Sequence, residues 1–177
     1  PKDEIELRNL LYTAQKGLDR PIAIRYPRGN TRFPLQYHPF SLMDIGQSIP
    51  VSHPSKTAKI AILTTGTLSV DMATARELCQ APEAFAHYHF PFVKPLDINR
   101  LAEISRQFNQ VITAEEGCIS GGFGASLVPF LLENNQCMKI KHLGVPDQFI
   151  AHGTPEQQKA SVGLDVNHLI KTLNECV

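Results

Sequence analysis

Two arginines follow a short apolar run at residues 21–30, PIAIRYPRGN. The β-branched residues of this run are typical of a buried strand, and Pro27 ends the strand because proline cannot donate to a sheet. Arg28 then lies just past a strand end, which is where open α/β sheets bind ligands. Its planar, permanently charged guanidinium suits a phosphate or a carboxylate. An interdomain salt bridge is the alternative interpretation of Arg28, and Arg25 is open to the same one.

Two adjacent carboxylates, Glu115 and Glu116, follow another predicted strand and precede a glycine-rich turn. A carboxylate pair at a strand end is suited to acid–base chemistry. Alternatively, one carboxylate caps the backbone amides at the start of the next helix, or bridges to another domain. The sequence leaves both interpretations open.

The turn itself resembles a phosphate-binding loop, because clustered glycines before a helix expose amides at its positive end. Its glycines are Gly117, Gly121, Gly122 and Gly124. It has neither the lysine of a P-loop nor a GxGxxG pattern. Close packing of a helix against a strand is therefore the competing explanation.

Histidines occur at two further places. His87 and His89 share one face of a predicted strand and are candidate metal ligands, but two ligands do not make a metal site. His142 and His152 flank the segment LGVPDQFIA at residues 143–151, which is interpreted as an ordered loop. His152 precedes a helix start, where a buried polar contact or an interface role is open to it.

Composition excludes several classes of protein. The 177 residues carry 17 basic and 17 acidic side chains with no run of either sign, so neither nucleic acid nor a membrane surface is an expected partner. The apolar stretches are shorter than the roughly 20 residues of a membrane span, and a cytoplasmic location is expected. The four cysteines form no CxxC pair, so reduced thiols are expected rather than a zinc site or a disulfide framework.

The positions of helices and strands predict three parts. A helix is predicted over residues 3–16, with Asp3 as N-cap and Gly17 as its stop, and the strand at residues 21–30 follows it. These residues, 1–30, are expected to be the last helix and strand of a preceding domain, with residues 31–45 as a linker. The third part is residues 46–177.

Within residues 46–177, short apolar runs alternate with helical patterns. This alternation predicts an α/β fold with a mainly parallel sheet covered by helices on both faces. Edge and inner strands are expected at residues 47–51, 59–63, 84–90, 110–114 and 138–143. Helices are expected from residue 68, at 97–108, near 123–132, from 154 and from 165, with Pro129 bending or delaying the third.

Six motifs in order give the chain a strong resemblance. They are RNLLYTA (8–14), PIAIRYPRGN (21–30), FVKPLDI (92–98), TAEEGCISGGFG (113–124), LGVPDQFI (143–150) and HGTPEQQ (152–158). Together they resemble the 1-deoxy-D-xylulose-5-phosphate synthase family, across nearly the whole chain. The resemblance implies a transketolase C-terminal-type domain preceded by the end of a pyrimidine-binding domain.

The same resemblance implies a full-length enzyme that uses thiamine diphosphate and Mg²⁺, both bound by residues outside this chain. The implied substrates are pyruvate and D-glyceraldehyde 3-phosphate, and a homodimer is the implied assembly. Arg28 matches the arginine that holds the phosphate of the aldehyde, whereas Arg25 orients the turn or pairs with an acid. The catalytic glutamate is expected upstream of residue 1, so neither Glu115 nor Glu116 takes that role.

The sequence departs from this family at one strand end. An Asp-x-Arg usually precedes FVKPLD, and His89, Phe90 and Pro91 stand there instead. The strand end is therefore expected to lose a charged pair. Alternatives to the synthase are a non-catalytic assembly or dimerisation domain, and a transketolase or dehydrogenase β-subunit relative.

Overall fold

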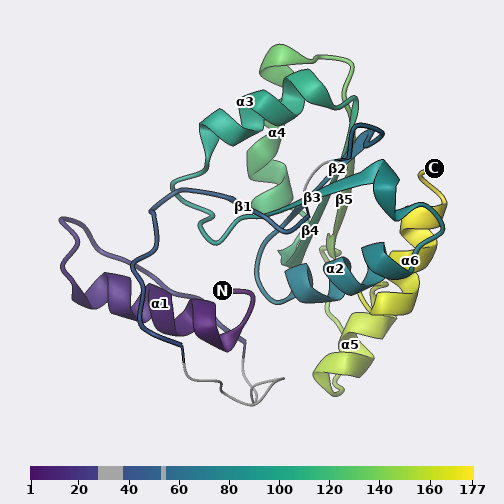
Figure 1. Cartoon of the computed structure of the whole chain (residues 1–177). Coiled ribbons are helices and arrows are strands. Elements are labelled where there is room, and N and C mark those ends of the chain that lie inside the picture. Colours follow the sequence, from purple (N-terminus) through teal and green to yellow (C-terminus); the bar gives the residue numbers. More distant parts are fainter. Residues whose placement is uncertain (28–37, 53–54) are drawn as a thin grey trace.

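The computed structural model describes residues 1–27, 38–52 and 55–177, and Arg28 and part of the expected linker lie outside them. The described chain is organised around a five-stranded sheet with the order β1-β3-β2-β4-β5 (Figure 1). The strands are β1 (Ile49–Pro50), β2 (Ile60–Thr64), β3 (Phe85–His89), β4 (Gln110–Cys118) and β5 (Lys139–Val145). Only β1 runs antiparallel, against β3 at one edge, so the expected mainly parallel sheet is confirmed.

The inner strands are apolar because both of their faces are covered. Every residue of β2 is buried, and in the parallel register Ile60 lies opposite Phe85 of β3 and Gln110 of β4. Successive side chains of a strand point to opposite faces. Ala61 and Leu63 therefore join the core on one face, while Ile60 and Ile62 join the core on the other.

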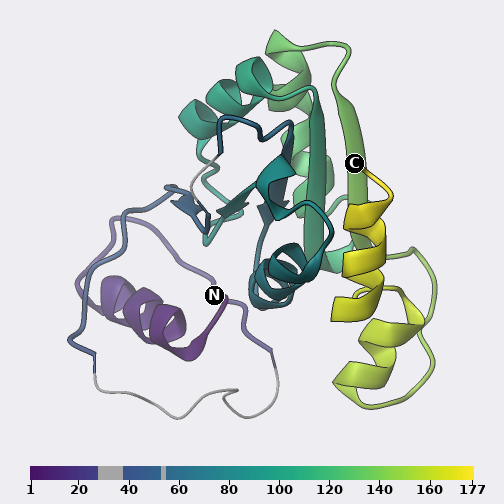
Figure 2. The same cartoon turned by 45° about the vertical axis from the view of Figure 1, so that its right-hand side comes forward.

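Helices cover both faces of the sheet, as Figures 1 and 2 show. The first core holds buried leucines from α3 (Ile98–Gln107) and α4 (Phe123–Asn134), among them Leu101 and Leu127. The second core holds Leu68 of α2 (Leu68–Leu78) and Leu169 of α6 (Val166–Asn174). A short 3-10 helix, η1 (Pro82–Ala84), leads into β3.

Helix starts occur where capping residues stand in the sequence. Asp3 accepts a hydrogen bond from Glu6 N at 2.7 Å and caps α1 (Glu4–Gln15). Thr154 and Gln157 form a capping box at α5 (Pro155–Ser161), and Asp165 caps α6. These three predicted starts are confirmed.

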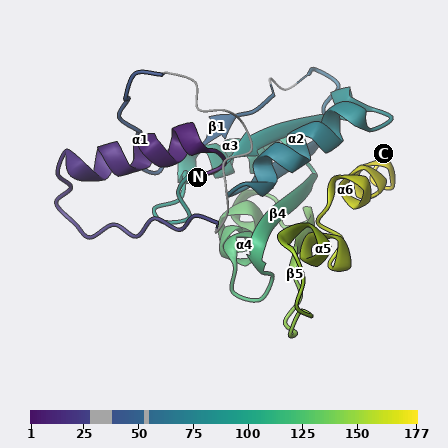
Figure 3. The same ribbon diagram turned by 90° about the horizontal axis from the view of Figure 1, so that it is seen from below.

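Helix α1 lies outside the two helical layers, beside the sheet (Figure 3). It packs against the returning segment at residues 39–43. The rings of Tyr12 and Phe40 lie 5.2 Å apart, and Oγ1 of Thr13 accepts from Met43 N at 2.9 Å. A single helix with one short packed segment has no core of its own, so α1 depends on its contacts with residues 38–52 and with the sheet.

Three sequence expectations need correction. Residues 21–27 form no strand, because a strand is held by hydrogen bonds to a neighbour and no described segment supplies them. Strand β4 does not stop at residue 114 but continues through Glu115 and Glu116, since Cys118 pairs with Val145 of β5. Pro129 does not delay α4, which begins at Phe123 and contains the proline in its interior.

In the part of the chain that the structure describes, no helix combines the length and the apolar character needed to cross a membrane. The four cysteines are free thiols; Cys79 is buried and Cys137 is exposed.

Candidate functional site

Polar side chains gather at the carboxyl ends of β2, β3 and β4, where α1 and residues 21–27 approach the sheet. Glu6 of α1 reaches His89, the last residue of β3. The guanidinium of Arg25 lies beside Gly117 near the end of β4. Because parallel strands present their carboxyl ends at the same edge, this is the edge at which an α/β sheet is expected to bind ligands.

Glu6, His89 and Ser69 form a line of close contacts. Nε2 of His89 lies 2.9 Å from Oε2 of Glu6, and Nδ1 of the same ring lies 2.5 Å from Oγ of Ser69. An acid, a histidine and a serine in this order resemble a nucleophilic triad. All three residues are at most 4% exposed, so no substrate can reach the serine, and we assign the contacts a structural role.

The line continues into the sheet through two more residues. Oγ1 of Thr64 lies 2.5 Å from Oγ of Ser69 and 2.8 Å from Nε2 of His87. Nδ1 of His87 is buried and has no hydrogen-bond partner among the described residues. The buried cluster therefore joins α1, α2, β2 and β3 through five side chains: Glu6, His89, Ser69, Thr64 and His87.

Burial and charge act in opposite directions on Glu6. Burial alone would raise the pKa of Glu6, but the hydrogen bond from His89 and its electrostatic attraction, with contributions from Lys2, outweigh it and lower the pKa to about 2. Burial, with a smaller electrostatic contribution from His89, lowers the pKa of His87 to about 3. At neutral pH, Glu6 is therefore a carboxylate and His87 a neutral imidazole.

These contacts define the surroundings of the two histidines. His87 and His89 do share a face, as expected, and three of their four ring nitrogens contact hydroxyl groups or a carboxylate. The described residues contain no group of three or more His, Cys, Asp or Glu placed to hold a metal. The strand end at His89 also keeps a charged partner, because Glu6 approaches from α1. The sequence did not reveal this partner, since 83 positions separate the two residues.

Glu115 closes the start of α4. Its two carboxylate oxygens accept from Phe123 N and Gly124 N, each at 2.9 Å. These are the free amides at the positive end of the helix, which favours a negative charge. The capping interpretation of Glu115 is therefore confirmed.

The glycines around this carboxylate are required by close packing. A Cβ on Gly122 would overlap the carbonyl oxygen of Cys118 and approach both oxygens of Glu115 to 2.5 Å. A Cβ on Gly117 would lie 2.6 Å from Oε2 of Glu115. Because Glu115 occupies the two amides, this turn has no donors left at them for a phosphate group.

The described residues do not fit the diphosphate and Mg²⁺ that the family resemblance implies. The α4 amides are occupied, and no metal-ligating cluster is present among the described residues.

Glu116 points to a different set of partners from those of Glu115. It accepts from Oγ1 of Thr67 at 2.7 Å and pairs with Nζ of Lys159 at 2.5 Å. Lys159 also pairs with Asp71 of α2 at 3.0 Å. Glu116 thus ties α5 to the loop before α2, so the bridge that it forms lies within residues 46–177.

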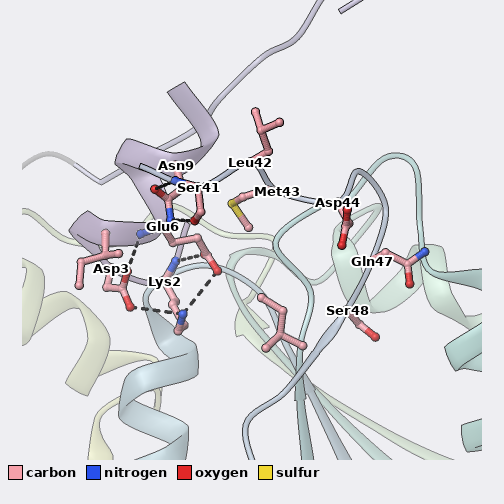
Figure 4. Close-up of a pocket in the computed structure, with 12 residues that line it drawn as sticks. Lys2, Asp3, Glu6, Asn9, Ser41, Leu42, Met43, Asp44, Gln47 and Ser48 are labelled. Carbon is pink, nitrogen blue, oxygen red and sulfur yellow. Dashed lines mark hydrogen bonds and ion pairs between the residues drawn. The ribbon is translucent and has the colours of Figure 1, made fainter. Parts of the chain in front are cut away.

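A cavity of about 530 Å³ opens between α1 and the segment at residues 41–49 (Figure 4). Lys2, Asp3 and Glu6 line it from the α1 side, and their charges are paired with one another through the Lys2 ammonium. Ser48, on the opposite wall, donates to Asp97 at 2.7 Å. The polar groups that line the cavity are thus largely paired with other groups of the same chain.

The remaining candidates lie elsewhere. Nδ1 of His142, a partly buried residue, lies 2.7 Å from Oγ1 of Thr113, beside Gly124. His152 is exposed in the loop before α5. Arg28 lies outside the described residues, so its place relative to this site remains a prediction.

Comparisons with known proteins agree with this architecture. The family model described as "Transketolase, C-terminal domain" matches residues 51–169. The 1-deoxy-D-xylulose-5-phosphate synthase of Cytophaga hutchinsonii is 35% identical over 175 residues, which is 98% of this chain and 27% of that protein. The synthase of Parabacteroides distasonis is 34% identical over 99% of this chain and 27% of its own length.

Among solved structures, a split-gene transketolase described as an inactive β4 tetramer superposes with a TM-score of 0.67. It is 21% identical, and the match covers 82% of this chain and 46% of that one, so it shows the fold alone. The chain spans about a quarter of the length of the curated synthases that it matches. Since the family model covers most of the sheet and its helices, the chain belongs to the transketolase C-terminal domain family.

Proposed function

We propose that this chain is the carboxyl-terminal part of a thiamine-diphosphate-dependent synthase. The reaction would condense pyruvate with D-glyceraldehyde 3-phosphate to give 1-deoxy-D-xylulose 5-phosphate and CO₂, a precursor of isoprenoids, thiamine and pyridoxal. The observation that carries the proposal is the 35% identity to such a synthase over 98% of the chain. This match includes α1 and residues 21–30, which lie outside the transketolase C-terminal match at residues 51–169.

The proposal includes a division of the chain. Residues 1–30 would end a pyrimidine-binding domain, residues 31–45 would link it to the next, and residues 46–177 would form the transketolase C-terminal-type domain. The preceding domains of the same polypeptide would bind thiamine diphosphate and Mg²⁺, in a cytoplasmic homodimer. The polar edge of the sheet, where α1 meets His89, would then be an interdomain contact rather than a catalytic centre.

Within that enzyme we assign Arg28 to the phosphate of the aldehyde substrate. Arg25, three residues earlier in the sequence, lies beside Gly117 near the carboxyl end of β4, which supports the proposal. A guanidinium that grips a remote phosphate would orient the aldehyde without taking part in bond making.

The test uses the full-length polypeptide that contains this chain. Formation of the deoxyxylulose phosphate is measured while each substrate is varied in turn, in Arg28→Ala and in the control Arg20→Ala, whose exposed side chain pairs with Asp19. A lost charged hydrogen bond of about 2–3 kcal/mol corresponds to a rise in KM for the aldehyde phosphate of at least about 30-fold. The KM for pyruvate should stay within about twofold.

Equal effects of Arg28→Ala on both substrates would refute the phosphate role. Absence of product from the unaltered enzyme would refute the reaction itself. Product from transketolase-type donors, or acetyl transfer to a lipoyl carrier, would instead support a transketolase or a dehydrogenase β-subunit relative.

A second function, as an assembly module, is favoured by the closed start of α4, where Glu115 occupies both amides. Under this hypothesis the 177-residue chain alone neither binds thiamine diphosphate nor decarboxylates pyruvate. Turnover by the isolated chain would contradict it. The two functions are compatible, because one describes the enzyme and the other this part of it.

A further inference from the structure

The buried cluster from Glu6 to His87 allows its protons to be counted. Glu6 is ionised and therefore only accepts, so Nε2 of His89 must carry the proton that lies between them. Three contacts remain, namely His89–Ser69, Ser69–Thr64 and Thr64–His87, and each needs one proton. The hydroxyl groups of Ser69 and Thr64 supply one proton each, so a ring nitrogen at one end must supply the third.

One arrangement starts at His87. Its Nε2–H donates to Thr64, Thr64 donates to Ser69, and Ser69 donates to Nδ1 of His89. Each of the four contacts along the chain then has one proton, and the longer contact of Thr64 with the Tyr88 carbonyl oxygen, at 3.4 Å, has none. Nδ1 of His87, which has no partner among the described residues, keeps a lone pair rather than an N–H. This arrangement adds no charge to the cluster beyond that of Glu6.

The reverse arrangement starts at His89. A proton on its Nδ1 would donate to Ser69, Ser69 to Thr64, and Thr64 to Nε2 of His87. The neutral His87 ring would then carry its proton on Nδ1, where a buried N–H has no acceptor among the residues that the structure describes. A buried donor without a partner loses its hydration and gains nothing in return, so this arrangement is the less stable one.

We propose that Glu6, His89, Ser69, Thr64 and His87 form one oriented hydrogen-bond chain, with donation running from His87 to Glu6, that latches α1 to the sheet. Its end at Glu6 is balanced by a cation from its own segment, the ammonium of Lys2 at 3.5 Å. At the other end, electrostatic interactions with His89 and, more weakly, with Arg76 of α2 disfavour a charge on His87. The latch does not depend on the proposed enzymatic reaction.

The first experiment reads the protons directly in the unaltered 177-residue chain. Long-range ¹H–¹⁵N correlation spectra at pH 7.5 distinguish protonated from unprotonated ring nitrogens, and His87→Gln and His89→Gln assign the two rings. We expect a proton on Nε2 and a lone pair on Nδ1 in both. A proton on Nδ1 of either His87 or His89 would overturn the proposed direction.

The second experiment tests the latch. Hydrogen exchange of the α1 amides is compared with that of the α6 amides in Glu6→Gln and in the control Glu4→Gln, which alters the same first turn outside the chain of contacts. Loss of the buried charge should speed α1 exchange at least about tenfold and leave α6 unchanged. Equal rates in the two variants, or equal acceleration of α1 and α6, would refute a latch specific to α1.

A third variant separates direction from mere packing. Thr64→Val removes the hydroxyl that accepts from Nε2 of His87 and nearly keeps the shape of the side chain. We expect His87 to populate both tautomers, while His89 keeps its proton on Nε2 because Glu6 is still present to accept it. An unchanged single tautomer of His87 would show that Thr64 does not orient the ring and would contradict the oriented chain.

Discussion

His87 shows how little a residue type says about its role without its neighbours. Two histidines on alternate positions of a strand are candidate metal ligands from the sequence, and the structure confirms that they share a face. Their partners Thr64 and Ser69 come from β2 and from α2 and could not be paired with them from the sequence. Likewise Arg28, the residue with the most specific predicted role, rests on family resemblance and remains a prediction.

The buried His87 should make the stability of the protein depend on pH. The pKa of His87 in the folded state, about 3, lies below the ordinary value of 6.5. Below pH 6.5, the unfolded chain therefore binds a proton at this residue that the folded chain does not bind. This contribution is complete above pH 6.5 and is lost as the pH falls toward 3, by about 1.4 kcal/mol per pH unit.

Urea unfolding of the wild type and of His87→Gln measures how their free energies of unfolding depend on pH. We choose pH 7.5, 6.0, 5.0 and 4.5 to span this range. Between pH 6 and 4.5, we expect the free energy of unfolding to fall less steeply with decreasing pH in the variant than in the wild type. The two slopes should differ by about 1.4 kcal/mol per pH unit, which corresponds to the binding of about one proton. Glu6 adds to the loss only at lower pH, because its pKa is lowered from 4.5 to about 2. His152→Gln, at an exposed histidine in the loop before α5, is the control. Parallel curves for wild type and His87→Gln would show that His87 titrates normally in the folded state.

At the scale of elements, local signals predicted helix starts well and strand ends poorly. Asp3, Thr154 and Asp165 cap helices through contacts with residues two or three positions away, so the sequence contains the whole interaction. A strand ends where its neighbour ends, and β4 runs on through Glu115 because β5 accompanies it. For the same reason residues 21–27, apolar as they begin, form no strand without a neighbour.

The turn before α4 yields a prediction that separates packing from backbone strain. Gly122 has a φ of −81°, open to any residue, but a Cβ there would overlap Cys118 and Glu115. Gly121 has a φ of +71° and open space around it. Gly122→Ala should lower the free energy of unfolding by roughly 2–4 kcal/mol, through steric overlap and weakened capping by Glu115. Gly121→Ala should cost only about 1 kcal/mol of strain.

Urea unfolding of both variants measures these values, and Gly121→Asn and Gly122→Asn extend the comparison. Asparagine tolerates a left-handed backbone, so the first should be nearly neutral and the second as damaging as alanine. If Gly122→Ala cost no more than Gly121→Ala, the space around Glu115 would be larger than the structure shows.

At the scale of the whole molecule, apolar contacts join the helices to the sheet in two cores, whereas a polar contact joins α1 to the sheet. Both apolar cores consist of residues between 60 and 173, drawn from the sheet and from α2, α3, α4 and α6. Helix α1 meets the sheet through Glu6 and His89, a buried charged contact at one point. The alternation of strands and helices in the sequence was enough to predict the two apolar cores. The contact between Glu6 and His89 could not be predicted in this way, because it depends on which end of the sheet α1 reaches.

This division predicts that residues 46–177 fold without α1. A piece of the chain starting at Gly46 keeps both cores and β1, and it loses only the packing of α1 and the partner of His89. Water can solvate His89 once α1 is gone, so the loss should be about 1–3 kcal/mol rather than the full cost of a buried unpaired group. Urea unfolding followed by circular dichroism should show one cooperative transition in the 177-residue chain and one in residues 46–177. The m-value of residues 46–177 should be slightly smaller. A non-cooperative transition in residues 46–177 would show instead that α1 is an integral part of this domain, and that its boundary lies before residue 1 rather than in the linker.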